Sequence, residues 1–564
     1  MPATTRRPTM GRTQTFLAVG LIAMVACGGD SAPFPSDAGD GARRLVAQTT
    51  SGELSGAWAD ETAGVAVFRG IRFAQPPVGD LRWRPPAPVT SWEGTVAASE
   101  FGPACWQARN PDNSPYARGE LPRSEDCLTL NVWSPVGAGE RLPVMVWFHG
   151  GGHSSGVGSA TIFDGTAMAN NGVLMVTANY RLGPLGFLAH PALTAESHHG
   201  ASGNYGILDH VATLEWVRDN IAAFGGNPDN VTIFGQSAGS WSVCALQASP
   251  LARGLFHKAI GHSGGCFGGP RAHLSRTGGG VATESSGHDI GLAIAAELGA
   301  EGEGPDLAVA LRAAEPEAVM NAQRAAGQGT GVIVDGWVLP ALPDAIFAAG
   351  EQNDVPVILG SMSDEGSTLY AGMAELPRNQ FVAGIRDQYG EQADAVLAAY
   401  VEEVDSSTKT AGQAIAADRN FTWQMRAWAR AIGGTNDVFL YFFSHAPPVF
   451  RLYLPDRPHL DFPAGRRGAG AYHSGDLAYA FGNVGLVGIE WDDRDRDLSD
   501  QMSKYWSNFA KTGDPNGDGL PEWPRYDRAS EGAIEFATVG TVPTSKVREA
   551  KLDLFDSTYQ VGGN

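Results

Sequence analysis

The sequence predicts an α/β fold with a central, mostly parallel sheet flanked by helices. Short apolar runs alternate with segments of helical periodicity along most of the chain, which is typical of parallel strands joined by helical crossovers. No low-complexity linker separates these segments, and 43% of the 564 residues are apolar. We therefore expect one large domain over residues 46–560.

The expected elements follow one another in the order that such a sheet needs. The apolar run 142–148 predicts a buried strand, and 204–224 repeats apolar residues every three or four positions, as a helix does. Further strands are expected at 173–179, 230–234, 355–359 and 438–443, and a further helix at 240–248. The Gly- and Ala-rich stretch 268–350 has weak periodicity, and we interpret it as helices and loops that lie over the functional site.

The N-terminal residues are typical of an export signal. Three arginines precede the apolar run 16–26, which is too short to span a bilayer. The run ends at Cys27 in the string LIAMVACGGD, which is similar to a bacterial lipoprotein signal. We expect a signal peptide at 1–26 and a flexible tether at 27–45. The protein would then be lipid-anchored in the cell envelope through Cys27, or else secreted.

The cysteine count agrees with export. Setting Cys27 aside leaves four of the five cysteines, which can pair in an oxidising compartment. Sequence order pairs Cys105 with Cys127 and Cys244 with Cys266. Each bridge would close a loop of about 23 residues and stabilise the fold by about 3 kcal/mol. The alternative for the second pair is two buried thiols.

Charge and motifs exclude several classes of partner. The net charge is -21, and Lys and Arg do not cluster, so no nucleic-acid partner is expected. Neither Cys-x-x-Cys nor His-Glu-x-x-His occurs, so we expect no metal ion. A membrane contact is expected only through the N-terminal anchor.

Ser237 is the candidate nucleophile. It lies in the string GQSAG (235–239), between a predicted strand and a predicted helix. A sharp strand-to-helix turn exposes a serine hydroxyl to a base and to backbone amides, and its tightness requires glycine on both sides. The string GHSGG (261–265) matches the same pattern, but glycines and a proline follow it instead of a helix. We therefore interpret Ser263 as a strand-end residue.

Glycines after the strand 142–148 can stabilise the oxyanion that such a serine would create. Gly150, Gly151 and Gly152 allow close approach of backbone N–H groups, and loops of this kind act together with the amide that follows the nucleophile, here Ala238.

The acid and the base are less clearly defined. In this type of fold the nucleophile precedes the acid, and the acid precedes the histidine. An acid in a loop after strand 355–359 would be Glu365 or Asp364, and the histidines that follow are His445, His459 and His473. Local pattern favours His445, directly after strand 438–443, as much as His473.

Five strings cover nearly the whole mature chain in a fixed order: FRGIRFAQPPVGDLRWRPP (68–86), SEDCLTLNVWSP (124–135), NYRLGPLGFL (179–188), GNYGILDHVATLEWVRDNIAAFGGNPDNVTIFGQSAGS (203–240) and YWSNFAKTGDPN (505–516). Together they resemble the type B carboxylesterase family, the cholinesterase-like branch of the α/β hydrolases. The resemblance implies an α/β-hydrolase fold and hydrolysis of small to medium carboxylic esters.

The resemblance also assigns roles to residues. The acid matches Glu365 in the string DEGS, the histidine matches His473 in AYHSGDLAYAFG, and Cys105 and Cys127 match the first disulfide of the family. It implies acyl transfer through an acyl-enzyme on Ser237, with the oxyanion held by Gly151, Gly152 and Ala238 and no cofactor.

Two departures from the family pattern affect substrate choice. The residue before the nucleophile is usually Glu in the family, but it is Gln236 here, which removes a negative charge from the pocket. Trp106 is badly placed for choline binding, so a cholinesterase is not expected. Asp476 matches an acidic position that joins a buried polar network in relatives. We predict that Gln236, Ser263 and Asp476 lie close together beneath the catalytic groups; the alternative for Asp476 is a helix N-terminal charge.

Two alternative functions remain at this point. A lipase for long acyl chains would need an apolar tunnel or a lid. A non-catalytic surface binding protein on the same fold would be expected to lose its nucleophile, and the presence of Ser237, Glu365 and His473 counts against it.

Overall fold

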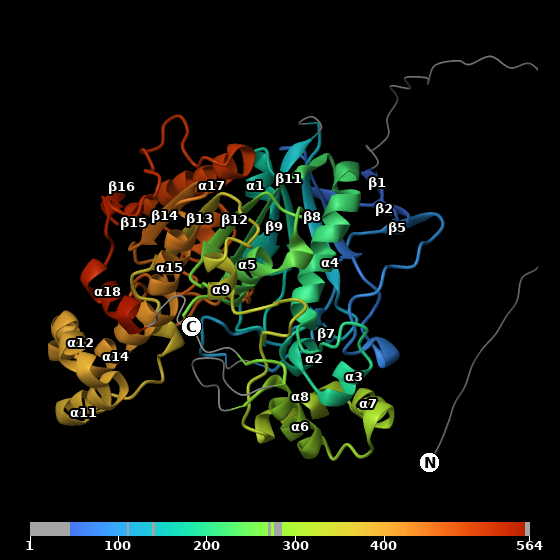
Figure 1. Ribbon diagram of the computed structural model, residues 1–564. Coiled ribbons are helices and arrows are strands. Elements are labelled where there is room, and N and C mark those ends of the chain that lie inside the picture. The colour runs from blue at the N-terminus through green and yellow to red at the C-terminus, as the bar shows by residue number, and fades with distance from the viewer. Residues whose placement is uncertain (1–44, 110–111, 138–140, 269–271, 276–284, 559–564) are drawn as a thin grey trace, which may run out of the picture. The chain divides into compact units, whose positions relative to one another are not determined.

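An 11-stranded mixed sheet lies at the centre of the computed structural model (Figure 1). The structure describes residues 45–109, 112–137, 141–268, 272–275 and 285–558. The expected signal peptide and Cys27, with all of the tether before Leu45, lie outside these residues.

The strand order across the sheet is β16 (Gly540–Ser545), β15 (Gly532–Ala537), β14 (Val438–Phe443), β13 (Val357–Met362), β12 (Lys258–His262), β11 (Gly226–Gln236), β9 (Leu142–Phe148), β10 (Leu174–Ala178), β8 (Thr129–Pro135), β4 (Val65–Arg72) and β3 (Ala57–Asp60). Neighbours from β15 to β10 are parallel. The strands at both margins are antiparallel. The expectation of a mostly parallel sheet is therefore confirmed.

The central parallel strands carry continuous buried apolar runs because helices cover both faces of the sheet. In β9, Val144, Val146 and Phe148 pack into one core, and Met145 and Trp147 pack into the other. The first core is closed by α4 (Tyr205–Asn220), α5 (Ala238–Ala248), α9 (Pro343–Ala348) and α15 (Trp423–Ile432). The second is closed by α1 (Thr166–Asn170) and α17 (Asp493–Thr512), which Figure 1 labels, and by the short helix α16 (Leu477–Ala480).

Helix α17 shows how the sequence sets these layers. It begins with a capping box between Asp492 and Asp495 and ends at Gly513, whose φ of 84° stops the helix. Its buried apolar side chains recur with helical spacing at Leu498, Met502, Trp506 and Phe509. Each such side chain, once buried, contributes about 1.5–3 kcal/mol.

Two groups of inserted helices lie at the carboxyl end of the parallel strands, at the bottom of Figure 1. The first is α6 (Gly287–Leu298), α7 (Gly304–Ala313) and α8 (Pro316–Ala325), with α8 packed on α2 (Gly183–Phe187), which follows β10. The second is α11 (Arg378–Tyr389), α12 (Ala393–Ala399), α13 (Val401–Ser406) and α14 (Thr408–Ala417), with α14 packed on α10 (Gly366–Leu369), which follows β13. The stretch 268–350 is thus helical over much of its described part.

The remaining helices are α3 (Pro191–Ala195), α18 (Glu549–Thr558), the 3-10 helices η1 (Gly79–Leu81), η2 (Thr161–Phe163), η3 (Ile221–Phe224), η4 (Pro250–Ala252) and η5 (Gly390–Gln392), and the π-helix η6 (Asp418–Thr422). The remaining strands are β1 (Val46–Gln48), β2 (Glu53–Ser55), β5 (Thr95–Ala97), β6 (Ala104–Cys105) and β7 (Arg123–Ser124). None of the helices in the described part of the chain combines the length and the apolarity that a membrane span requires.

Both expected disulfides are present. The Cα atoms of Cys105 and Cys127 are 5.0 Å apart, and those of Cys244 and Cys266 are 5.8 Å apart. The alternative of two free thiols at Cys244 and Cys266 is therefore wrong.

Candidate active site

Ser237 occupies the turn between β11 and α5. Strand β11 ends at Gln236, and the helix begins at Ala238, so the single residue between them turns the chain with φ 58° and ψ -123°. A Cβ atom at Gly239 would lie 2.0 Å from the carbonyl oxygen of Phe148, so that glycine is required for packing. The structure therefore shows the sharp strand-to-helix turn that the sequence predicts.

Ser263, the second serine that matches the Gly-x-Ser-x-Gly pattern, lies in a different structural context. Ser263 follows β12, and its N–H donates to the carbonyl of Gly360 at 2.8 Å, continuing the sheet. Its side chain is fully buried, and the next helix in the described part of the chain begins at Gly287. The interpretation of Ser263 as a strand-end residue agrees with this geometry.

The glycine loop after β9 lies against Ser237. A Cβ atom at Gly150 would lie 3.1 Å from Cβ of Ser237, and Gly151 and Gly152 have φ of 113° and 64°. The carbonyl of Gly151 accepts the N–H groups of two serines further along the turn. Among the described residues, no hydrogen bond engages the N–H of Gly151, Gly152 or Ala238. These donors are suited to bind an oxyanion beside Ser237.

The structure brings Glu365 and His473 together. Glu365 follows β13 and His473 follows β14, and these adjacent parallel strands end at the same edge of the sheet. His473 Nδ1 lies 2.5 Å from Glu365 Oε2, and both side chains are buried. The other carboxylate oxygen of Glu365 accepts the N–H of Met362 at 2.9 Å. The backbone N–H of Met362, the last residue of β13, thus holds the carboxylate that contacts His473.

Asp364 forms hydrogen bonds with the backbone of the loop that carries His473, unlike Glu365. Its N–H donates to the carbonyl of Ala471, and its carboxylate accepts the N–H of Ala471, both at 3.0 Å. These two bonds join the loop after β13 to the loop that carries His473. Asp364 therefore holds the two loops in register.

The second ring nitrogen of His473 faces the nucleophile turn. A carboxylate at Nδ1 accepts a hydrogen bond from the N–H of that nitrogen, so in the neutral ring the lone pair lies on Nε2. The side-chain amide nitrogen of Gln236 lies 2.9 Å from Nε2 and donates to it. Because Gln236 directly precedes Ser237, this contact places Nε2 of His473 beside the strand-to-helix turn that carries the serine.

Two aromatic side chains hold the histidine from other directions. The Tyr116 hydroxyl donates to the His473 carbonyl and lies 2.8 Å from Thr368 Oγ1. Burial raises the pKa of Tyr116, so its hydroxyl stays a donor. The ring of Phe421, in the π-helix η6, lies 4.7 Å from the His473 ring.

The other two candidate histidines are placed elsewhere. His445 Nε2 lies 2.8 Å from Asp495, whose carboxylate also accepts from Tyr479 and Arg467. His459 is exposed, and its carbonyl accepts a hydrogen bond from Arg451. The structure thus pairs neither of them with Glu365.

The predicted cluster of Gln236, Ser263 and Asp476 is not joined by direct hydrogen bonds among the described residues. Asp476 instead accepts from His262 at 2.8 Å and from Tyr441 at 2.9 Å. Ser263 Oγ and the second oxygen of Asp476 are buried and have no partner in the described part of the chain. The proximity of the three side chains stays a prediction.

Several residues around the site have no signature in the sequence. His262, Tyr116 and Phe421 contact site residues that lie far away along the chain. His262 precedes Ser263 in the rejected motif, which was the one signal that could have drawn attention to it. Within the described residues, no group of three or more His, Cys, Asp or Glu side chains is arranged to hold a metal ion.

Comparisons with known proteins agree with this geometry. The model of the Carboxylesterase family matches residues 43–555. The chain belongs to this family. It is therefore a serine esterase that hydrolyses ester bonds, on the α/β-hydrolase fold.

Relatives of this carboxylesterase include bacterial enzymes of known activity. It is 36% identical to the fumonisin B1 esterase of Sphingopyxis macrogoltabida, over 88% of this chain and 87% of that protein. It is 33% identical to the para-nitrobenzyl esterase of Bacillus subtilis, over 88% and 96% of the two chains. The crystal structure of a Geobacillus stearothermophilus carboxylesterase matches 91% of this chain and all of its own, with a TM-score of 0.75 and 31% identity.

Proposed function

We propose that the carboxylesterase hydrolyses its esters with a triad of Ser237, His473 and Glu365 through an acyl-enzyme intermediate. The observation that carries this proposal is the position of His473, whose Nδ1 lies 2.5 Å from Glu365 while Nε2 faces the turn of Ser237. This is the arrangement in which a histidine accepts a proton from a serine and an acid stabilises the resulting charge.

The reaction proceeds in two halves. Ser237 Oγ attacks the ester carbonyl carbon as its proton passes to His473 Nε2, and Glu365 stabilises the imidazolium. The N–H groups of Gly151, Gly152 and Ala238 bind the oxyanion, each contributing about 2.7–4 kcal/mol to lowering the barrier. His473 then protonates the departing alcohol, and water, activated by the same nitrogen, releases the acid from Ser237.

The relatives support small and medium esters as substrates, because two of them are named for fumonisin B1 and for para-nitrobenzyl esters. Hydrolysis of 4-nitrophenyl esters of increasing chain length separates this proposal from a long-chain lipase. A rate that falls from butyrate to palmitate supports the esterase.

We also propose that the enzyme is exported. The two disulfides, one of which ties α5 to the segment after β12, support folding in an oxidising compartment. Labelling with a radioactive lipid precursor, in the wild type and in Cys27→Ala, distinguishes an anchored from a secreted protein.

The nucleophile is tested by Ser237→Ala on 4-nitrophenyl butyrate. We expect kcat/KM to fall by about 10⁴-fold or more, because no other group can form the acyl-enzyme. Ser263→Ala is the matched control, since it alters the same sequence pattern on the neighbouring strand. Full turnover by the Ser237 variant would exclude the proposed mechanism.

A further inference from the structure

Arg118 is a buried guanidinium without an ion-pair partner among the described residues. Its side chain belongs to a residue that is only 4% exposed. Of the five N–H groups of an arginine, one donates to the Tyr116 carbonyl at 3.2 Å. Nε is buried without a partner in the described part of the chain. Burying a cation in this way is costly unless something else compensates it.

The other buried arginines show what is missing at Arg118. Each has at least one carboxylate within ion-pair distance, and these arginines are Arg82, Arg181, Arg312 and Arg426. Arg181, for example, lies 2.6 Å from Asp209, with both side chains buried. The fold therefore neutralises its buried arginines as a rule, and Arg118 departs from that rule.

Arg118 lies beside the loop that faces the nucleophile. Its Nη2 is 3.1 Å from the position that a Cβ atom of Gly151 would occupy, and its guanidinium packs 4.4 Å from the centre of the Tyr453 ring. Two residues earlier, Tyr116 bonds to the backbone of His473. The segment 116–118 thus runs from His473 to the glycine loop after β9, residues 150–152, which we call the oxyanion loop.

The charge of Arg118 acts on this part of the site. The pKa of His149 is lowered to about 3, mainly by burial, and the charge of Arg118 is a smaller contributing cause of that lowering. The groups nearest the nucleophile do not neutralise the guanidinium. Gln236 is uncharged, and Glu365 is engaged by His473 and the backbone.

We infer that Arg118 binds a carboxylate of the substrate, so that the preferred substrates are esters with a free carboxylate close to the bond that is cleaved. A carboxylate can accept the unused N–H groups of the guanidinium in pairs and supplies the missing counter-charge. This inference rests on the proposed esterase function and specifies the substrate class of that site.

A purely structural role explains less of the geometry. Stacking on Tyr453 and one bond to Tyr116 would hold the loop, but they leave four of the five N–H groups without a partner among the described residues. A long apolar side chain could cover the same ring. The two roles therefore predict different outcomes when the charge is removed.

The experiment compares matched charged and neutral esters. One pair carries the carboxylate on the acyl side, mono-4-nitrophenyl glutarate against 4-nitrophenyl valerate. The other carries it on the alcohol side, 4-carboxyphenyl butyrate against phenyl butyrate. The variants are Arg118→Met, which keeps the packing on Tyr453, and Arg118→Lys, which keeps the charge.

We expect Arg118→Met to lower kcat/KM for one of the two charged esters by about ten- to a hundredfold and to change its neutral partner by no more than about threefold. Arg118→Lys should fall between the wild type and Arg118→Met. The pair that responds identifies the side of the ester that carries the carboxylate. Unfolding temperatures of both variants show whether the loop still folds.

Two results would overturn the inference. Equal losses on charged and neutral esters would show that Arg118 supports the loop, and unchanged kcat/KM on both charged esters would show that it binds no carboxylate. The proposed function fails separately, if the wild type does not hydrolyse the neutral esters in a manner that depends on Ser237.

Discussion

Among the individual residues, His473 is held from several directions at once. Glu365 fixes Nδ1, Gln236 lies at Nε2, Tyr116 binds the backbone carbonyl and Phe421 packs on the ring. A ring restrained in this way keeps one orientation, which the proposed role of His473 as general base requires. His445 is equally buried, but its surroundings form an ion-pair network with no nucleophile.

Substituting His473 and His445 one at a time distinguishes the proposed catalytic histidine from the structural one. We expect His473→Gln to lower kcat/KM on 4-nitrophenyl butyrate by about 10³-fold or more, because the base is lost. We expect His445→Gln to keep the activity and to lower the free energy of unfolding by about 1–3 kcal/mol, because Asp495 loses one of its buried partners. Steady-state rates and urea unfolding of both variants provide the measurement. Loss of activity in the His445 variant alone would reverse the assignment.

Short patterns were enough to find some of these residues and not others. Ser237 and the glycines around it are local, since a turn between a strand and a helix needs them in sequence order. The choice of His473 over His445 depends on where the chain between β14 and His473 folds back, and only the family resemblance indicated it. Arg118 lies in a loop without regular periodicity, so its burial could not be foreseen.

Among the secondary-structure elements, the nucleophile helix is tied down by a covalent bond. Cys244 lies on α5, and its partner Cys266 follows β12 beyond Gly264, where an added Cβ would lie 2.5 Å from the carbonyl oxygen of Ser237. The disulfide thus joins the helix that begins after Ser237 to the segment that packs against it. The predicted strands and helices of this region are correct, but the π-helix that carries Phe421 has no recognisable sequence signal.

Removing this bridge should weaken the protein measurably. The double variant Cys244→Ala, Cys266→Ala is expected to lose about 2–4 kcal/mol of unfolding free energy, because the unfolded chain gains freedom that the loop denied it. Urea unfolding of the variant and of the wild type, both without reductant, measures this loss of unfolding free energy. The matched control is the double variant at Cys105 and Cys127, whose sequence separation is the same, 22 residues. Unchanged stability at the first pair would contradict the prediction.

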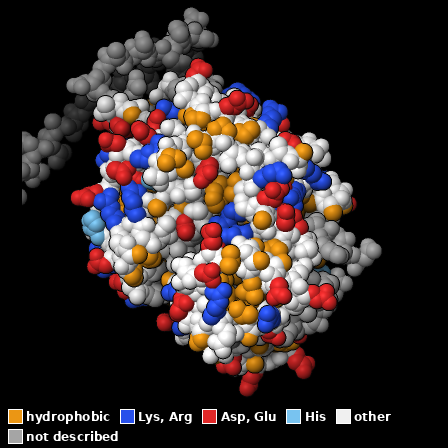
Figure 2. All heavy atoms as spheres, turned by 90° about the vertical axis from the view of Figure 1, so that its left-hand side faces the viewer, with side chains coloured by type: hydrophobic (Ala, Val, Ile, Leu, Met, Phe, Trp, Pro, Cys, Tyr) orange, Lys and Arg blue, Asp and Glu red, His pale blue; other side chains and the backbone are white. Residues whose placement is uncertain are grey.

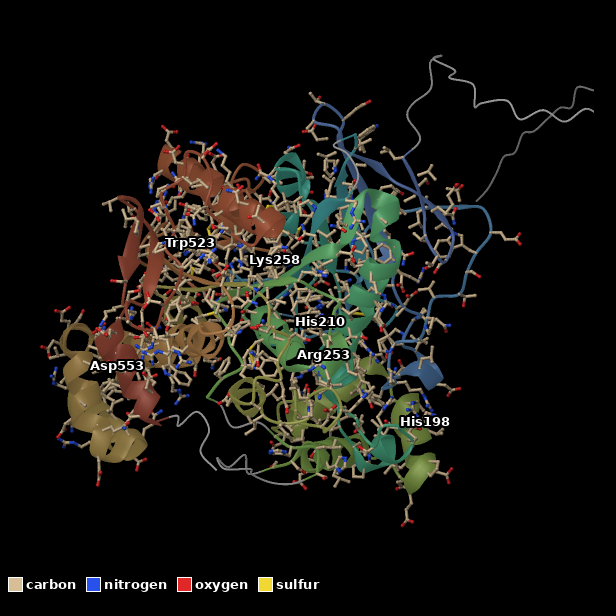
Figure 3. The ribbon with its side chains drawn as sticks, turned by 45° about the horizontal axis from the view of Figure 1, so that its top comes forward. His198, His210, Arg253, Lys258, Trp523 and Asp553 are labelled. Carbon is tan, nitrogen blue, oxygen red and sulfur yellow. A yellow bond between two sulfur atoms is a disulfide. The ribbon has the colours of Figure 1, made fainter. Side chains whose placement is uncertain are left out.

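Across the whole molecule, the sheet provides the rigid frame and polar groups are enclosed within it. The face in Figure 2 shows acidic and basic side chains interspersed with hydrophobic ones, without a patch of one sign. Inside, His210 lies near the centre of the molecule (Figure 3), with its ring 4.1 Å from that of Phe148 and 4.3 Å from that of Tyr180. The alternation of strands and helices made the parallel frame predictable, whereas no helical crossover pattern marks the antiparallel margins.

These enclosed histidines should make the fold sensitive to acid. Burial lowers the pKa of His149 to about 3 and that of His210 well below its usual value, so both are neutral in the folded protein. The unfolded chain takes up these protons below about pH 6.5. Stability is therefore complete above that pH and falls as the pH drops toward 3, by up to about 1.4 kcal/mol per pH unit for each histidine.

The variant His210→Phe tests whether His210 makes the stability fall as the pH drops. Phenylalanine packs in the same aromatic surroundings and cannot take up a proton, so the variant should lose less unfolding free energy than the wild type between pH 7 and pH 5. Urea unfolding at several pH values measures the difference. Parallel curves for the two proteins would show that His210 does not contribute to acid sensitivity.

The Cys105–Cys127 bridge bears on how the enzyme must be prepared. The loop that it closes carries Tyr116 to His473 and Arg118 to the oxyanion loop, while Ser237 and Glu365 are placed by strands of the sheet. Protein made in a reducing cytoplasm keeps the groups that the sheet positions but loses the restraint on the loop. Turnover of a neutral ester then reports the loss of the contact between Tyr116 and His473, whereas the inference on Arg118 predicts that a charged ester reports the displacement of Arg118 as well.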